Sequence, residues 1–180
     1  MHQPLTMKRN WLDRLRAAPA AAAALAVFVV GFGALGGAWY FQYVLKLAPC
    51  PLCLDERIPY YVIIPLSLLL AIAALARAPR PLLALGFAAI VVAALCGAAL
   101  GAYHAGVEWR FWPGPTDCTG PLANLNAGGS LLDQLNSVHV VRCDEAAWRF
   151  LGISLAGYNF LISLAMAALA GCGLLARKAG

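Results

Sequence analysis

Residues 81–107 read PLLALGFAAIVVAALCGAALGAYHAGV and contain no Asp, Glu, Lys or Arg. The run is longer than the about 20 apolar residues that a helix needs to cross a hydrocarbon core about 30 Å thick. Because that core holds no water, the backbone must satisfy its own hydrogen bonds, so the run is expected to be helical. This stretch therefore predicts a membrane-spanning helix.

Three further stretches lack charged residues, so the same pattern extends over the whole chain. Together with residues 81–107, they make up 102 of the 180 residues. Charged residues form only 12% of the chain, about half of their share in soluble domains. We predict an all-α membrane protein, a single domain over residues 1–180 built as a four-transmembrane-helix bundle, and we exclude a large soluble core. The expected spans are Ala17–Tyr40, Ile58–Ala76, Leu82–Tyr103 and Phe150–Ala176.

The distribution of charge predicts how the chain crosses the membrane. The two tails and the turn at 77–81 carry eight cations and one acid, whereas the opposite side carries five cations and seven acids. By the positive-inside rule, both termini are expected in the cytoplasm. Two loops, 41–57 and 104–149, then face the opposite compartment. The net charge of +5 follows from this topology and does not predict a nucleic-acid partner.

Three local features complete the predicted topology. A cleaved signal peptide is the alternative for the first span, but the apolar run there is much longer than the about 7–15 residues of such signals.

Pro65 is expected to break the helical hydrogen bonding of the second span, as a kink. In the long loop, Ser130 is expected to cap a short helix with an apolar face at Leu131, Leu132, Leu135 and Val138. That helix would lie on the membrane surface or pack against the first loop.

Four of the six cysteines lie in the two loops. Cys50 and Cys53 are in the short loop, and Cys118 and Cys143 are in the long one. An even number of cysteines facing an oxidising compartment indicates disulfides. The other two, Cys96 and Cys172, lie inside apolar spans, where a thiol behaves as a small hydrophobic group.

The pair Cys50-Pro51-Leu52-Cys53 indicates redox chemistry. A disulfide that closes so small a loop removes little chain entropy, so stabilisation alone is a weak reason for it. The same spacing occurs in thiol–disulfide exchange proteins, where it favours a thiolate. The pair also lies at the edge of the second span, within reach of a lipid-soluble electron acceptor. We expect no metal, because Cys118 and Cys143 are too far apart in sequence to complete a zinc site of two such pairs.

Two basic side chains accompany this pair. If the span begins near Cys53, Arg57 and the N-terminal peptide dipoles are expected to favour a thiolate at Cys53. Taken alone, an arginine at this position is more often an interfacial anchor whose charge reaches the headgroups. His104 ends the third span on the same side, where it could hydrogen-bond a quinone carbonyl, handle its protons, or anchor the helix end. Glu108 would lie beside His104 if the helix continues, and we assign it no role.

With these residues assembled, the chain resembles the bacterial disulfide-bond formation protein B (DsbB) family. The resemblance covers nearly the whole length: four spans, Cys50 and Cys53 followed by Glu56-Arg57, and two further loop cysteines. The stretches Tyr103–Trp109 and Cys143–Gly152 also resemble family motifs. Pro51 stiffens the cysteine pair, and the Pro-rich stretch after Trp112 leaves the path of the second loop open.

The resemblance implies a thiol oxidase of the bacterial inner membrane with its redox loops in the periplasm. Such an enzyme reoxidises a soluble DsbA-like dithiol oxidase and passes the electrons to a quinone, ubiquinone or menaquinone. By motif, a Cys118–Cys143 disulfide would receive the electrons, and Cys118 would form the mixed disulfide with the partner. An inter-loop disulfide from Cys50 to Cys118 would leave Cys53 as the thiolate facing the quinone. Arg57 and His104 would complete the quinone site.

Two other functions remain as alternatives. The first is a four-span structural or adhesion protein whose outer loops are held by disulfides; it leaves the cysteine pair at the membrane edge unexplained. The second is an enzyme resembling vitamin K epoxide reductase, in which the electron-accepting pair is expected near the last span. Here the pair precedes the second span.

Overall fold

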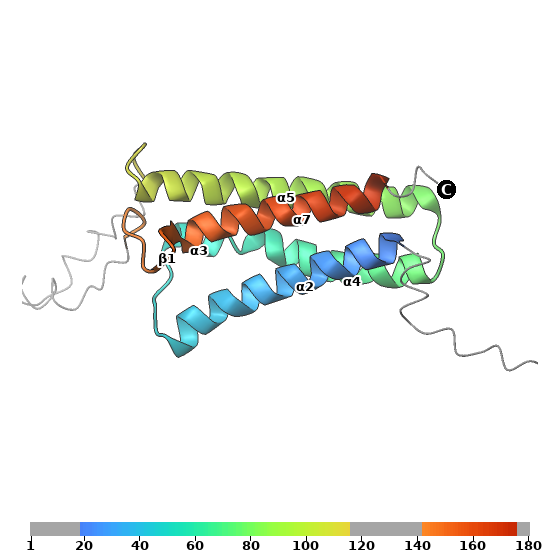
Figure 1. The fold of residues 1–180 in the computed structure, drawn as a ribbon, viewed down its shortest axis with the longest axis horizontal. Helices are drawn as coiled ribbons and strands as arrows, with labels where there is room; N and C mark the ends of the chain where they lie inside the picture. Colours follow the sequence, from blue (N-terminus) through green and yellow to red (C-terminus); the bar gives the residue numbers. More distant parts are fainter. Residues whose placement is uncertain (1–18, 116–141, 176–180) are drawn as a thin grey trace, which may run out of the picture.

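Four long helices run side by side along the molecule (Figure 1). The computed structural model describes residues 19–115 and 142–175. Helix α2 packs on α4 and on α7, and α5 packs on both α7 and α4, so each helix has two neighbours. The helices are α2 (Pro19–Trp39), α4 (Ile58–Leu75), α5 (Arg80–Glu108) and α7 (Leu155–Leu175).

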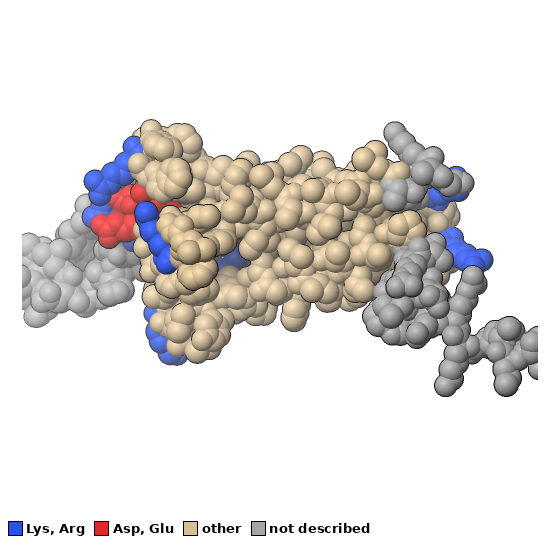
Figure 2. Space-filling view, in the orientation of Figure 1, with Lys and Arg blue, Asp and Glu red and all other residues tan. Residues whose placement is uncertain are grey.

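The surface of the bundle is as apolar as its interior. Within the described ranges, four helical stretches are long and apolar enough to cross a membrane. Large side chains such as Leu69, Leu85 and Val92 are exposed on them. Figure 2 shows Lys, Arg, Asp and Glu gathered mainly at the two ends, with an uncharged belt between them. The prediction of an all-α, four-helix membrane bundle is confirmed.

The core combines close helix contact with large side chains. Phe87, Ile63 and Met166 are fully buried, and they come from three different helices. Helices α5 and α7 approach closely at Gly101, where an added Cβ would lie 2.8 Å from the backbone nitrogen of Phe160. Glycine is required there because the neighbouring atom is backbone and cannot rotate away.

The first three helices differ from the expected spans mainly at their ends. After Trp39 the first span continues as a π-helix, η1 (Tyr40–Val44). Helix α4 continues through Pro65, so this residue removes one backbone donor without ending the helix. Helix α5 extends beyond the expected end at Tyr103 to Glu108. A short helix, α3 (Pro51–Asp55), precedes α4.

The fourth span starts later than expected. Residues 149–154 form an antiparallel hairpin of β1 (Arg149–Phe150) and β2 (Ile153–Ser154), in which Phe150 pairs with Ile153. The two turn residues, Leu151 and Gly152, both have positive φ, as a tight two-residue hairpin turn requires. The hydrophobic run is therefore interrupted by a turn, and α7 begins only at Leu155.

The acidic residues that the structure describes belong to the end of the bundle that carries the cysteine pair. Asp55 and Glu56 adjoin α3, Glu108 ends α5, and Asp144 and Glu145 precede the hairpin. The turn between α4 and α5, at the other end, carries Arg77 and Arg80. The predicted surface helix at Ser130 and the loop residue Cys118 lie outside the described residues.

Candidate redox site

Cys50 and Cys53 are brought together by the short helix α3. Cys50 is the N-cap residue of this helix, and Pro51 occupies the first turn, where a missing N–H costs nothing. The backbone N–H of Cys53 donates to Cys50 Sγ at 3.2 Å. The two sulfur atoms lie 2.7 Å apart, and both cysteines are free thiols. The local helix therefore places the pair for formation of a disulfide.

Within this dithiol, hydrogen bonds favour the thiolate at Cys50. The pKa of the Cys50 thiol is lowered from its ordinary value, chiefly by the hydrogen bond from the Cys53 side chain. Burial opposes this effect, and the backbone N–H of Cys53 adds to it. Cys50 is therefore the better nucleophile of the pair in this state, because the thiolate is the reactive form.

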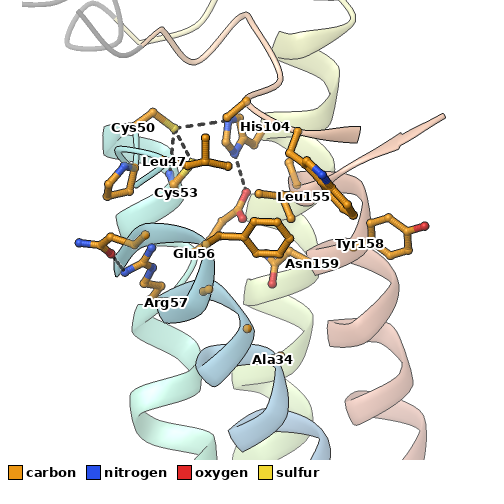
Figure 3. Close-up of a pocket in the computed structure, with 18 of the residues that line it drawn as sticks. Ala34, Leu47, Cys50, Cys53, Glu56, Arg57, His104, Leu155, Tyr158 and Asn159 are labelled. Carbon is orange, nitrogen blue, oxygen red and sulfur yellow. Dashed lines mark hydrogen bonds and ion pairs between the residues drawn. The ribbon is translucent and has the colours of Figure 1, made fainter. Parts of the chain in front are cut away.

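The sequence analysis expected these stabilising groups at Cys53 instead. The first helical turn starts two residues earlier than that argument required, so its N-cap is Cys50. The Arg57 guanidinium donates to Gln42 Oε1 at 2.6 Å (Figure 3). Arg57 thus joins η1 to the start of α4, on the wall of the cavity that Cys53 also lines.

His104 connects the cysteine pair to a buried carboxylate. Its Nε2 lies 3.6 Å from Cys50 Sγ, and its Nδ1 lies 2.8 Å from Glu56 Oε1 (Figure 3). His104 is only 3% exposed and Glu56 only 8%. A carboxylate at Nδ1 holds the proton on that nitrogen, which leaves Nε2 able to accept a proton from Cys50. The three side chains therefore form a cysteine–histidine–glutamate chain.

Glu56 is a site residue to which the sequence analysis gave no role. It lies between α3 and α4, and the turn there directs its side chain inward. An ionisable residue at the head of an apolar span was the available signal, since such residues are rare and are usually functional. Its partner His104 is 48 positions away, so their contact could not be read from spacing.

Glu108 lies beside His104, as a continuing helix predicted. Its Oε1 is 4.0 Å from His104 Nε2, one helical turn along α5. The Glu108 side chain is only 5% exposed. Two buried glutamates, Glu56 and Glu108, therefore flank one imidazole.

A cavity of about 530 Å³ opens beside the cysteine pair. Figure 3 shows Cys50, Cys53, Glu56, Arg57 and His104 grouped at one end, with Ala34 further along the bundle. The apolar walls come mainly from α2, the loop that follows it, and α7, so an apolar molecule of moderate size fits beside the polar groups. These apolar lining residues include Val30, Ala34, Leu35, Phe41, Leu47, Trp148, Phe150, Leu155 and Ile162.

Cys143 packs in the same small cluster as the redox pair. The buried members of this cluster are Cys50, Leu52, Val107 and Cys143, with Cys53 packed against them. Cys143 is disulfide-bonded, whereas Cys96 and Cys172 are exposed free thiols on α5 and α7. The second loop thus brings a disulfide sulfur next to the first pair.

Metal binding is the remaining chemistry to consider for these groups. The ligand atoms of Cys50, Cys53 and His104 all lie within 4.8 Å of one another. Two thiolates on one tetrahedral zinc, with Zn–S near 2.3 Å, would be about 3.8 Å apart. The observed 2.7 Å between the sulfurs is too short for two ligands of one zinc, and it suits a pair that closes into a disulfide.

Comparison with known proteins decides the family. The family model described as Disulfide bond formation protein DsbB matches residues 20–173, which include every described residue of this site. The chain belongs to the DsbB family. A Disulfide bond formation protein B of Xanthomonas oryzae pv. oryzae is 32% identical over 163 residues, covering 85% of this chain and 92% of the relative.

Two further relatives match this DsbB-family chain at lower identity. A Disulfide bond formation protein B of Aromatoleum aromaticum is 28% identical over 158 residues, covering 87% of this chain and 92% of the relative. An uncharacterized protein of Rickettsia prowazekii is 28% identical over 145 residues. No solved structure matches the chain. The family, the membrane-spanning helices and the cysteine cluster together identify a membrane protein of disulfide bond formation with oxidoreductase chemistry.

Proposed function

We propose that this protein is a thiol:quinone oxidoreductase that reoxidises a DsbA-like periplasmic dithiol oxidase. One observation carries the proposal: a free Cys50–Cys53 pair lines an apolar cavity at one end of a membrane bundle, packed against the disulfide-bonded Cys143. A scaffold protein has no need of a reduced pair beside a cavity. A DsbA-type partner, at about −120 mV, is too oxidising to be regenerated by a glutathione-like pool, so a stronger acceptor is required.

Electrons would pass through two disulfide exchanges. The reduced partner attacks a Cys118–Cys143 disulfide at Cys118, which breaks that bond and leaves the partner oxidised. The reduced Cys118 then exchanges with a Cys50–Cys53 disulfide, through an inter-loop bond between Cys50 and Cys118. Cys53 is released as a thiolate. Packing of Cys143 in the Cys50 cluster supports this relay, because exchange requires sulfur atoms to meet.

The quinone, ubiquinone or menaquinone, would occupy the cavity that Cys53, Arg57 and His104 line. There it accepts two electrons and two protons and becomes the quinol. The cavity walls are largely apolar, with the charged and polar groups at one end, which suits a polar ring with an apolar tail. Arg57 would favour anionic oxygen on the reduced ring.

Location follows from the same chemistry. Disulfides persist in the periplasm and not in the cytoplasm, so the cysteine end of the bundle would face the periplasm. The Arg77 and Arg80 turn, together with both termini, would lie on the cytoplasmic side of the bacterial inner membrane. Charge and redox chemistry thus support the same orientation.

The test is anaerobic turnover of the purified protein with a reduced DsbA-like partner and added quinone, following quinol absorbance. We expect sustained quinol formation by the parent and none by Cys50→Ser or Cys53→Ser. The matched control is the Cys96→Ser/Cys172→Ser double variant, which removes two exposed thiols away from the site and should turn over normally.

Normal turnover by Cys53→Ser would contradict the proposal. Loss of thermal stability in the Cys50 and Cys53 variants, with no quinol formed by the parent, would instead favour the structural or adhesion function.

A further inference from the structure

Two buried polar atoms in the described part of the chain have no hydrogen-bond partner. They are Glu108 Oε2 and Asn159 Nδ2. Buried polar groups in folded proteins are nearly always paired, so each unpaired one requires an explanation. Both residues line the cavity beside the cysteine pair. A ligand with two polar atoms would supply what each of them lacks.

Neighbouring contacts leave these two atoms unpaired. Tyr60 donates its hydroxyl to Asn159 Oδ1 at 2.6 Å, which fixes the amide and leaves Nδ2 as the group without a partner. The Glu108 carboxyl accepts a hydrogen bond from Ser154, and its Oε1 faces His104 Nε2 at 4.0 Å. In each side chain, one polar atom is used by the protein and the other is not.

Asn159 and Glu108 are placed along α5 so that a single quinone ring could contact both of them. Asn159 Nδ2 lies 3.1 Å from the Cβ position of Gly101, and Glu108 is seven residues further along the helix. Seven residues correspond to about 10 Å of helix. Because the Glu108 side chain reaches back to His104, its carboxyl lies nearer to Asn159 than this rise, and a quinone ring with carbonyl oxygens on opposite sides can hydrogen-bond both groups.

We propose that Asn159 and Glu108 bind the two carbonyl oxygens of the quinone, and that neutral Glu108 gives a proton to one of them during reduction. The proposal rests on the quinone oxidoreductase function proposed above. It gives Asn159 a binding role and makes Glu108 a proton-transfer residue. Neither residue was assigned a role from the sequence.

The protons and electrons balance through groups already described. Oxidation of Cys50 and Cys53 to a disulfide breaks two S–H bonds and releases two electrons and two protons, and the quinone takes up the same numbers as quinol. One proton would pass from Cys50 to His104 Nε2, 3.6 Å away, and then to Glu108. Glu108 would deliver its own proton from Oε2. The Cys53 proton would leave to water on the side of the cavity lined by exposed Arg142 and Glu145, and the second proton of the quinol would come from the same water.

The charge state of Glu108 depends on groups from several elements. They include His104 on α5, Ser154 on β2, Arg149 on β1 and the nearby Glu56, all of which act on the Glu108 carboxyl. The other titratable or charged groups lining the same cavity are Cys50, Cys53, Arg57, Tyr60, Arg142, Glu145 and Tyr158.

The experiment measures quinol formation by the full-length protein in lipid nanodiscs, with a reduced DsbA-like partner, as a function of pH and quinone concentration. For Glu108→Gln we expect kcat to fall about 100-fold, as when a general acid is lost, with KM for quinone little changed. The decline of the parent rate at high pH, where Glu108 loses its proton, should disappear. Glu108→Asp should restore part of the rate.

For Asn159→Ala we expect the effect on KM and not on kcat. The KM for quinone should rise about tenfold with kcat nearly unchanged, because one hydrogen bond to the bound ring is lost. Asp55→Asn removes an exposed carboxylate outside the cavity and should match the parent. Exchange between partner and protein without quinone should be normal in all variants.

A parent-like kcat and pH profile in Glu108→Gln would overturn the proposal while leaving the oxidoreductase function intact. Slow disulfide exchange without quinone in Glu108→Gln and Glu108→Asp alike would also overturn it, since the residue would then act on the thiols or the fold. Absence of quinol from the parent would overturn the proposed function itself.

Discussion

At the level of single residues, the site is organised around Cys50. This sulfur accepts the backbone N–H of Cys53, contacts the Cys53 thiol and faces His104 Nε2. A thiolate at Cys50 is thus stabilised by the backbone N–H and the thiol of Cys53, and by His104 once the imidazole has taken up the Cys50 proton. Stabilisation of this kind favours the thiolate that attacks another disulfide.

Replacing Cys53 should therefore make Cys50 less reactive. The folded-state pKa of Cys50 lies below the ordinary thiol value, so its thiolate persists to lower pH than in a free cysteine. Cys53→Ala removes the largest stabilising hydrogen bond and should shift the alkylation profile of Cys50 to higher pH. The measurement is the rate of Cys50 alkylation against pH in the reduced protein. An unchanged profile would show that the Cys53 side chain does not stabilise the thiolate.

Glu56 should control Cys50 through His104. With Glu56→Gln, the imidazole loses the carboxylate that holds its Nδ1 proton, so Nε2 becomes a poorer acceptor for the Cys50 proton. We expect disulfide exchange at neutral pH to slow about tenfold or more, a loss typical of impaired acid–base catalysis. Asp55→Asn, one residue away and exposed, is the matched control. Equal exchange rates in the two variants would show that Glu56 does not act on Cys50 through His104.

The sequence was a good guide to which residues carry the chemistry. It was a poorer guide to the contacts between them. Cys50, Cys53 and His104 were expected near one membrane edge, and the structure groups them there. The helix start was misplaced by two residues, which moved the stabilised sulfur from Cys53 to Cys50. The contact of Glu56 with His104 depends on the packing of α5 against α3 and α4, which local spacing does not encode.

At the level of elements, the close contact of α5 and α7 positions the site. Gly101 on α5 allows this approach. As a result, Ser154 on β2 reaches Glu108, and Asn159 on α7 reaches the cavity. The length of α5 matters equally, because its last turns carry both His104 and Glu108. The sequence predicted this helix but ended it at Tyr103, whereas α5 continues to Glu108.

A methyl group at Gly101 should separate these helices. Gly101→Ala places a Cβ 2.8 Å from the backbone nitrogen of Phe160, so the helices must move apart. We expect a loss of about 1–3 kcal/mol of unfolding free energy, as in overpacked cores, with weaker quinone binding. Gly36→Ala on α2 is the control, because its Cβ would meet nothing within 4 Å. Thermal unfolding of both variants tests this, and equal stabilities would contradict the close contact.

The hairpin before α7 shows why the end of an apolar run is a poor guide to the end of a helix. Phe150, Leu151 and Ile153 have the hydrophobicity of a span, yet a turn at Leu151 and Gly152 reverses the chain. The positive φ of both turn residues decides the structure there, and hydropathy carries no information about it. The number and type of the long helices, in contrast, follow from composition and from the requirement for internal hydrogen bonds in lipid.

For the whole molecule, charge at the two ends and redox chemistry at one end lead to one orientation. The basic turn at Arg77 and Arg80 is opposite to the cysteine pair along the bundle. In oxidised protein with Cys96 and Cys172 replaced by serine, we expect Lys46→Cys to react with a membrane-impermeant maleimide added to intact spheroplasts. Pro79→Cys should react only after lysis. The reverse labelling pattern would contradict the orientation.

The most direct measurement is a single anaerobic turnover of the reduced protein with one equivalent of quinone and no partner. Thiols and quinol are both counted at the end of the reaction. The account predicts one quinol for each Cys50–Cys53 disulfide formed, and no quinol from Cys53→Ser. A folded, reduced parent that leaves both its thiols and the quinone unchanged would contradict it.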